Sequence, residues 1–212
     1  MSKNCHMIHQ WCNGMPKHSF PFNQEDVPLN GIYILFEKGE FAHGTNRIVR
    51  IGTHTGNNQL RSRLFQHFLK ENKDRSIFRK NIGRALLYKD RDSFLDQWDL
   101  DLTTRNARKD YSGLVDFGKQ EEIEKRVSKR IQDSFTFVVF QIEHKEKRLH
   151  FESRMISTAS LCDECRPSKN WLGLFSPKPR IRESGLWLVN ELWKTPLSEK
   201  DLEELKQIWR ME

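Results

Sequence analysis

The sequence predicts an α+β fold, in which a small three-stranded sheet, antiparallel or mixed, is flanked by helices. Three runs rich in β-branched and aromatic residues predict the strands, at residues 31–36, 47–53 and 135–140. Between and after these runs, apolar side chains recur at helical spacing and charges fill the other positions. The length of 212 residues fits one domain with a small addition.

Residues 1–29 are expected to form a polar N-terminal arm, because Pro16, Pro21 and Pro28 interrupt regular structure there. The arm either covers the first strand loosely or contributes half of a zinc site. The second alternative rests on a group of two cysteines and two histidines, namely Cys5, His6, His9 and Cys12.

The first two strands are predicted to form a hairpin, since the residues between them, 38–46, are typical of a turn. Side chains alternate along a strand, so Tyr33 is expected on one face with Gly31. Arg50 is likewise expected on one face with Ile48.

A helix is predicted to follow, with Asn57 or Asn58 as its N-cap and its end near residue 71. Arg63 and His67 lie one turn apart on the flank of its apolar stripe. A phenol, cations and an imidazole therefore converge beside glycines that leave room for a ligand, which indicates a phosphate site.

The chain is predicted to continue with a helix at 77–88, a polar insert at 89–118 and a helix at 119–133. Arg79 and its neighbouring cations are interpreted mainly as a solvated face, with phosphate contact as the alternative. Long inserts in compact domains are often functional, so the insert is a candidate for contacting nucleic acid.

The next helix is predicted at about residues 146–160, and it places Glu152 on the same face as Leu149 and Ile156. A carboxylate directed toward a core needs a partner or a metal ion. We interpret Glu152 as functional, with a simple ion pair to Arg63 as the alternative. After Pro177, two more helices are expected to pack back on the domain.

The composition restricts the class of protein. The formal net charge of +7 suggests an acidic partner such as a nucleic acid. No apolar run is long enough for a membrane span, and the first residues lack the apolar core of a secretory signal. The four cysteines are then expected as reduced thiols in a cytoplasmic protein. Zinc at Cys162 and Cys165 is not favoured, because one C-x-x-C pair without a suitably spaced second pair is a weak signal.

Several motifs in order resemble the GIY-YIG endonuclease superfamily. Gly31-Ile32-Tyr33 stands as the first signature triplet, and Arg50-Ile51-Gly52 stands where Tyr-Ile-Gly is expected. The motif Leu60-x-x-Arg63-Leu64-x-x-His67 matches the arginine helix of the family. Further along, Phe151-Glu152 looks like its acidic helix and Asn170 like its late asparagine. The resemblance divides the chain into an arm (1–29), a nuclease domain (30–175, with the insert at 89–118) and a helical C-terminal extension (176–212).

The resemblance implies a DNA endonuclease that depends on Mg²⁺ or Mn²⁺ and leaves a 5′-phosphate and a 3′-hydroxyl. Glu152 would hold the metal ion, and Arg63 would bind the scissile phosphate. Tyr33 would take the proton of the attacking water, with His67 or His54 as alternatives. Asn170 would orient groups in the site. Contacts to the substrate are expected from Arg50, His54, Arg61 and Arg79.

The departure from the family pattern is Arg50, which replaces a tyrosine. A guanidinium cannot accept a proton at neutral pH, so the identity of the base stays open. Two other classes remain: a nucleic-acid-binding module with a degenerate site, and an interaction domain stabilised by zinc. For the enzyme, roles in restriction, defence, mobile elements or repair remain open, and restriction or defence is favoured. RNA cleavage and dimer formation are also left open.

Overall fold

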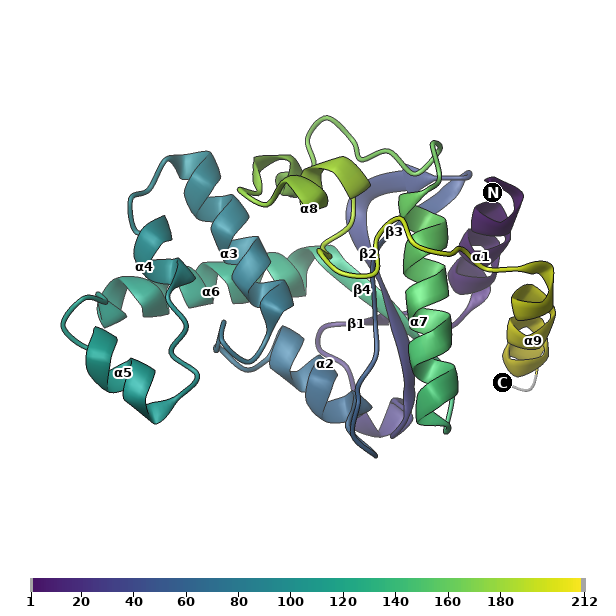
Figure 1. Ribbon diagram of the computed structural model, residues 1–212, viewed down its shortest axis with the longest axis horizontal. Coiled ribbons are helices and arrows are strands. Elements are labelled where there is room, and N and C mark those ends of the chain that lie inside the picture. Colours follow the sequence, from purple (N-terminus) through teal and green to yellow (C-terminus); the bar gives the residue numbers. More distant parts are fainter. Residues whose placement is uncertain (1, 211–212) are drawn as a thin grey trace.

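The computed structural model describes residues 2–210 and contains a four-stranded sheet in the order β1-β4-β2-β3, in which all neighbours are antiparallel (Figure 1). The predicted α+β class is confirmed. The strands are β1 (His18–Ser19), β2 (Gly31–Ala42), β3 (Thr45–Gly52) and β4 (Phe135–Gln141). The sequence did not indicate β1, because a two-residue strand has no periodic pattern.

The N-terminal stretch differs from the expected irregular arm. It begins with the helix α1 (Ser2–Gly14), which ends just before Pro16, and a short 3-10 turn, η1 (Gln24–Asp26), follows β1. The buried Ile8 and Cys12 place one face of α1 in a hydrophobic core. The prolines therefore determine where the helix ends, and they do not prevent it from forming because they lie beyond its last residue.

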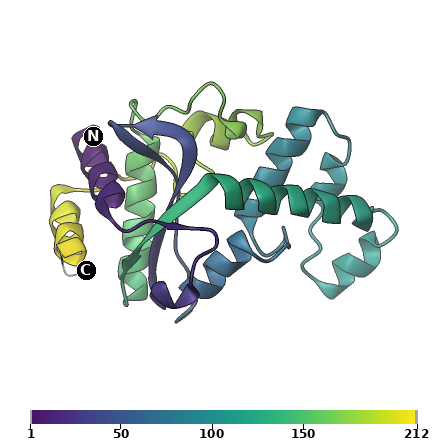
Figure 2. The ribbon, with the colours of Figure 1, turned by 180° about the vertical axis from the view of Figure 1, so that it is seen from behind.

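Helices cover both faces of the sheet. The first core lies under α2 (Leu60–Phe68), α3 (Ile77–Asp90) and α6 (Phe117–Ser134), together with η2 (Leu172–Phe175) and α8 (Pro179–Ser184). The second core lies under α1, α7 (Lys145–Ser160) and α9 (Glu199–Arg210). Residues of β2 alternate between the two cores, with Tyr33 in the first and Ile32 and Ile34 in the second. Seen from behind in Figure 2, α6 leads directly into β4.

The insert forms two short helices, α4 (Leu95–Asp99) and α5 (Arg105–Tyr111), which lie at the end of the molecule farthest from α9 (Figure 1). Trp98 fixes the insert to α3, because the buried indole donates from Nε1 to the Lys80 carbonyl oxygen at 3.0 Å. A Cβ on Gly83 of α3 would lie 2.3 Å from that indole, so only glycine permits this contact. The insert is thus fixed at one end, while the described side chains of α5 are exposed or half-buried.

A bulge in β3 changes which residues share a face. Leu35 pairs with Arg50, but its neighbour Phe36 pairs with Ile48, so Val49 is the extra residue. Val49 lies in the first core and Ile48 in the second. Arg50 lies 5.3 Å from the ring of Phe78 in the first core. The expectation that Arg50 and Ile48 share a face was therefore wrong.

The C-terminal residues form α8, an irregular segment at 185–198 and α9. Trp187 in the irregular segment continues the sheet edge, donating its backbone N–H to the Val49 carbonyl oxygen at 2.7 Å. Ser198 caps α9 as expected, because its hydroxyl accepts from the Asp201 N–H at 3.2 Å. Among the described helices, none combines the length and the apolar character needed to cross a membrane.

Candidate active site

A pocket of about 450 Å³ opens where the edge strand β3 ends, between α2 and α7. The two helices pack on opposite faces of the sheet, so the pocket lies at the sheet edge. Its lining is mostly polar, and it includes one carboxylate and one guanidinium. The lining residues are Thr53, His54, Thr55, Gln59, Ser62, Arg63, Gln66, Leu149 and Glu152.

Glu152 enters this pocket from α7. Its Oε1 accepts the backbone N–H of Thr53 at 3.0 Å, and no other described residue donates to this carboxylate. Burial raises the pKa of Glu152 above its usual range, while the Thr53 N–H and the charges of Arg50 and Arg63 oppose that rise. A half-buried carboxylate with one oxygen lacking a protein donor can accept a cation.

Arg63 enters from α2 and is half-buried. Its Nη1 donates to Gln66 Oε1 at 3.3 Å and to the Arg75 carbonyl oxygen at 3.2 Å. These two bonds orient the guanidinium without using its Nε and Nη2 donors, which have no acceptor among the described residues. Two donors of a planar fork thus remain for an anion.

Tyr33, His67 and Arg50 form a buried hydrogen-bonded group next to the pocket. Tyr33 Oη lies 2.8 Å from His67 Nε2, and Arg50 Nε donates to the same phenol oxygen at 3.3 Å. His67 Nδ1 lies 2.7 Å from Ser76 Oγ, and Arg50 also donates to the carbonyl oxygen of Trp187. Burial, followed by the nearby arginine charges, holds the pKa of His67 well below its usual range, so this ring is uncharged at neutral pH.

Gly52 connects this group to the pocket. It pairs with Tyr33 across the two strands, and a Cβ on Gly52 would lie 2.3 Å from Tyr33 Oη. The next residue, Thr53, is the donor to Glu152. The phenol therefore occupies the space that a side chain at position 52 would fill, and position 52 directly precedes the Thr53 N–H that donates to Glu152.

His54 also lines the pocket, but its ring nitrogens are both engaged. Nδ1 donates to the Gly56 carbonyl oxygen at 2.7 Å, and Nε2 accepts the Gly31 N–H at 3.3 Å. Burial is the main cause that lowers the pKa of His54. The imidazole is then uncharged at neutral pH, and it holds the start of β2 against the pocket wall.

Three other predicted site residues do not line the pocket. Arg61 donates from Nε to the Val27 carbonyl oxygen at 2.7 Å. Arg79 is fully buried and pairs with Glu124 of α6, with Nη2 and Oε2 2.7 Å apart. Asn170 is exposed in the turn before η2, and its side chain has no hydrogen bond to the described residues.

Two contacts in and beside the pocket were not predicted from the sequence. Thr53 donates to Glu152 through its backbone N–H, a group that every residue except proline carries and that no sequence pattern marks. Ser76 is the N-cap of α3 and also lies beside His67. A serine before an apolar helical pattern is a recognisable capping signal, but its contact with His67 depends on the tertiary fold.

A family model described as "GIY-YIG domain" matches residues 6–211. Neither the curated proteins nor the solved structures give a significant match.

Proposed function

This chain belongs to the GIY-YIG endonuclease superfamily, whose members are generally nucleases, and from that premise we propose that it is a metal-dependent DNA endonuclease. It would hydrolyse phosphodiester bonds by in-line attack of water. Restriction, defence or a mobile element would be its biological setting. The resemblance of the motifs supports this proposal, and the pocket supplies the chemistry that the reaction needs.

The observation that carries the proposal is that Glu152 and Arg63 line the same polar pocket. They come from helices on opposite faces of the sheet, and neither is neutralised by a direct ion pair with the other among the described residues. The alternative of a simple Glu152–Arg63 ion pair is therefore not supported. A pocket that offers both a carboxylate and a guanidinium can bind a metal ion at the first and a phosphate at the second.

The donor set at Glu152 fits Mg²⁺ or Mn²⁺. A single carboxylate in a polar pocket suits these ions, because they favour oxygen ligands and keep several waters. Oε2 of Glu152 has no donor among the described residues, so it is available as a ligand. When bound, such an ion supplies charge stabilisation to the phosphoryl oxygens and the leaving oxygen.

Arg63 would bind the scissile phosphate. The transition state of phosphoryl transfer carries charge on several oxygens, and the Nε and Nη2 donors of Arg63 are available to two of them. The bonds to Gln66 and Arg75 would keep the fork in place before the substrate arrives. This preorganisation favours the transition state over free solution.

Tyr33 is the base that the geometry supports best. Both nitrogens of His67 already have partners, since Nδ1 lies 2.7 Å from Ser76 Oγ and Nε2 lies 2.8 Å from Tyr33 Oη. Both nitrogens of His54 contact the backbone, so neither imidazole has a nitrogen left for a water in the pocket. Arg50 Nε donates to Tyr33 Oη at 3.3 Å, so a guanidinium lies directly against the phenol oxygen. In this assignment Arg50 supports the base in place of a second tyrosine, and Tyr33 Oη would take the proton of the attacking water.

Cleavage of a supercoiled plasmid and of an end-labelled duplex tests the proposal. We expect wild-type protein to cut DNA with Mg²⁺ or Mn²⁺ and not with EDTA, and to leave 5′-phosphate ends. Glu152→Gln should abolish cutting while DNA binding persists. Glu146→Gln, an exposed glutamate on the same helix, is the matched control and should cut normally.

The alternative function is a nucleic-acid-binding module with a degenerate site. It is favoured by the burial of Tyr33, which is 1% exposed, and by Arg50 at the second triplet. Wild-type protein that binds duplex DNA but does not cut it with either metal would establish this alternative. A duplex of the same sequence in RNA, tested in parallel, decides whether the substrate is DNA alone.

A further inference from the structure

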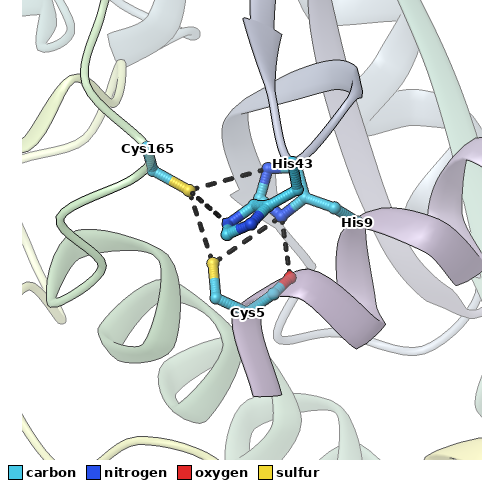
Figure 3. Close-up of side chains that lie close together, drawn as sticks. All are labelled: Cys5, His9, His43 and Cys165. Carbon is cyan, nitrogen blue, oxygen red and sulfur yellow. Dashed lines mark hydrogen bonds between the residues drawn. The ribbon is translucent and has the colours of Figure 1, made fainter. Parts of the chain in front are cut away.

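A second group of chemically reactive side chains lies far from the pocket in the sequence and on other elements. Figure 3 shows Cys5 and His9 of α1, His43 of the turn between β2 and β3, and Cys165 of the loop after α7 directed toward one another. One coordinating atom from each of the four lies within 4.8 Å of the others. Cys162, in the same loop, lies with its sulfur 3.4 Å from His43 Nε2.

We propose that this group is a structural zinc site in which Cys5, Cys162, Cys165 and Nε2 of His43 bind one Zn²⁺. Three thiolates and one imidazole are a common ligand set of closed, tetrahedral zinc sites. The site does not depend on the proposed nuclease activity, because none of its ligands lines the pocket that holds Glu152.

Three of the six edges of the proposed tetrahedron agree with the size of a zinc site. With Zn–S near 2.3 Å and Zn–N near 2.0 Å, the edges should be about 3.8 Å between two sulfurs and about 3.5 Å between sulfur and nitrogen. Cys5 Sγ and Cys165 Sγ are 3.4 Å apart. Cys165 Sγ and His43 Nε2 are also 3.4 Å apart, as are Cys162 Sγ and His43 Nε2. These separations lie within a few tenths of an ångström of the edges that zinc requires.

The choice of Cys162 over His9 as the fourth ligand rests on hydrogen bonds. His9 Nδ1 donates to the Cys5 carbonyl oxygen at 2.9 Å, and His9 Nε2 accepts the Ile48 N–H at 3.1 Å. Both ring nitrogens thus have backbone partners, and a nitrogen that accepts an N–H has no lone pair left for a metal. His9 would instead hold α1 against β3 behind the metal.

The surroundings of the site are those of a structural metal. The side chain of His43 is completely buried, and Cys5, Cys162 and Cys165 are at most 6% exposed. This burial leaves little room for the open position that a catalytic zinc needs. His43 Nδ1 lies 3.3 Å from Glu164 Oε2 without a hydrogen bond between them, so a carboxylate stands near the nitrogen that faces away from the proposed metal.

The sequence hid this site because its ligands come from three distant segments. The C-x-x-C pair at 162–165 lacks a second pair nearby, and its partners are separated from it by about 120 and 160 residues. Metal binding would join α1, the β2–β3 turn and the loop after α7, so it would close two long stretches of chain at one point.

The first experiment measures the metal in the intact protein purified without added chelator. We expect about one Zn²⁺ per chain by elemental analysis, with release of the metal and a lower melting temperature on treatment with a strong chelator. Co²⁺ in place of zinc should show the visible absorption of a tetrahedral site, with thiolate charge-transfer intensity that corresponds to three sulfurs. Protein without stoichiometric zinc, or with a Cys5–Cys165 disulfide, would overturn the proposal.

Variants then separate ligands from neighbours. Cys162→Ser and His43→Ala should lose zinc, whereas Cys12→Ser and His9→Gln should retain it. Cys12 is a matched control, since it is a buried free thiol on α1 outside the group. Retained zinc in Cys162→Ser together with lost zinc in His9→Gln would refute the ligand set. If Cys162→Ser does not fold, the charge-transfer intensity of the Co²⁺ wild type still decides between three thiolates and two.

Discussion

Arg63 offers both a positive charge and a planar set of hydrogen-bond donors, and replacement by lysine tests which of the two cleavage needs. Lysine keeps the charge but offers a compact ammonium in place of a planar fork. If Arg63 binds two transition-state oxygens, Arg63→Lys should lower single-turnover cleavage by about two to three powers of ten, nearly as much as Arg63→Ala, with little change in DNA affinity.

Arg61→Lys is the control for this prediction, because Arg61 lies on the same helix and donates to the backbone of residues 25 and 27. It should cut at a rate close to that of wild type. Near wild-type cutting by Arg63→Lys would mean that position 63 only attracts phosphate, and Arg50 would become the better candidate.

Gly52 permits the approach of Tyr33 to the pocket. In Gly52→Ala the new Cβ would overlap the phenol, which lies on a buried strand and cannot move freely. We expect a loss of stability of about 1–3 kcal/mol and a strong loss of cleavage at temperatures where the variant is folded. Gly113→Ala is the control, since a Cβ there meets no atom within 4 Å. Normal cleavage by folded Gly52→Ala would show that the position of Tyr33 is not needed.

Glu152 should reveal its burial in the pH dependence of stability. Its raised pKa means that the folded chain keeps this proton after the unfolded chain has released it. The proton on Glu152 therefore contributes fully to the stability of the fold below about pH 4.3, the usual pKa of an unfolded glutamate. This contribution is lost as the pH rises through the pKa of Glu152 in the folded chain. In EDTA, Glu152→Gln should therefore gain stability relative to wild type as the pH rises.

Thermal unfolding across this pH range measures the difference between the two proteins. Glu146→Gln, exposed on the same helix, should show no such gain. A constant difference between Glu152→Gln and wild type at all pH values would contradict the raised pKa.

At the scale of elements, α2, α3 and α6 are joined by one buried ion pair. Arg79 of α3 donates to Glu124 of α6 and also to the carbonyl oxygen of His67 on α2, at 3.2 Å. Glu124 in turn accepts the backbone N–H of Lys73 in the loop that leads to Ser76. The pair thus holds the segment that supports the His67 ring.

Removal of one partner should leave the other charged and buried. Arg79→Ala and Glu124→Ala are each expected to cost about 3–5 kcal/mol in denaturant unfolding. The double variant Arg79→Met/Glu124→Leu should cost less than either single change. At temperatures where it is folded, Arg79→Ala should bind DNA as wild type does. A specific loss of DNA affinity in this variant would restore Arg79 as a substrate contact.

The long elements were predictable from the sequence because their patterns are local. The strands β3 and β4 and the helices α3, α6 and α7 agree with the apolar periodicity within two residues, and Ser198 was predicted as the cap of α9. β2 instead continues to Ala42, through half of the turn predicted at 38–46, because the hairpin turns only at residues 43 and 44. Features that depend on distant residues were not predictable. The face of Arg50 depends on a bulge, the pairing of Arg79 depends on a glutamate 45 residues away, and α1 acquires its buried face from the second core. Asn170 was chosen by its order in the chain, which does not fix a position in space.

The molecule as a whole presents the insert at one end and α9 at the other (Figure 1). The net charge of +7 predicts DNA binding that weakens with salt, by about 0.9 in log affinity per log salt for each phosphate contacted. Arg105 and Lys109 are exposed on α5. If α5 contacts DNA, Arg105→Ala/Lys109→Ala should weaken binding and reduce this slope, with an unchanged cleavage rate at saturating DNA.

Lys200→Ala/Lys206→Ala on α9 removes the same charge from the opposite end and serves as the control. Fluorescence anisotropy at several salt concentrations measures both slopes. Equal losses in the two double variants would mean that net charge alone matters, and a flat salt dependence of the wild type would argue against nucleic acid as the partner.

The pairing of β2 has a consequence during synthesis on the ribosome. β2 joins β3 in a local hairpin, but its other edge waits for β4, which begins at Phe135. At about 5–20 residues per second, the roughly 90 residues between β2 and β4 take about 5–20 s to emerge. For that interval the nascent chain exposes an apolar strand edge that can pair with another copy. A stalled or truncated product that lacks β4 is therefore expected to aggregate and to require a chaperone.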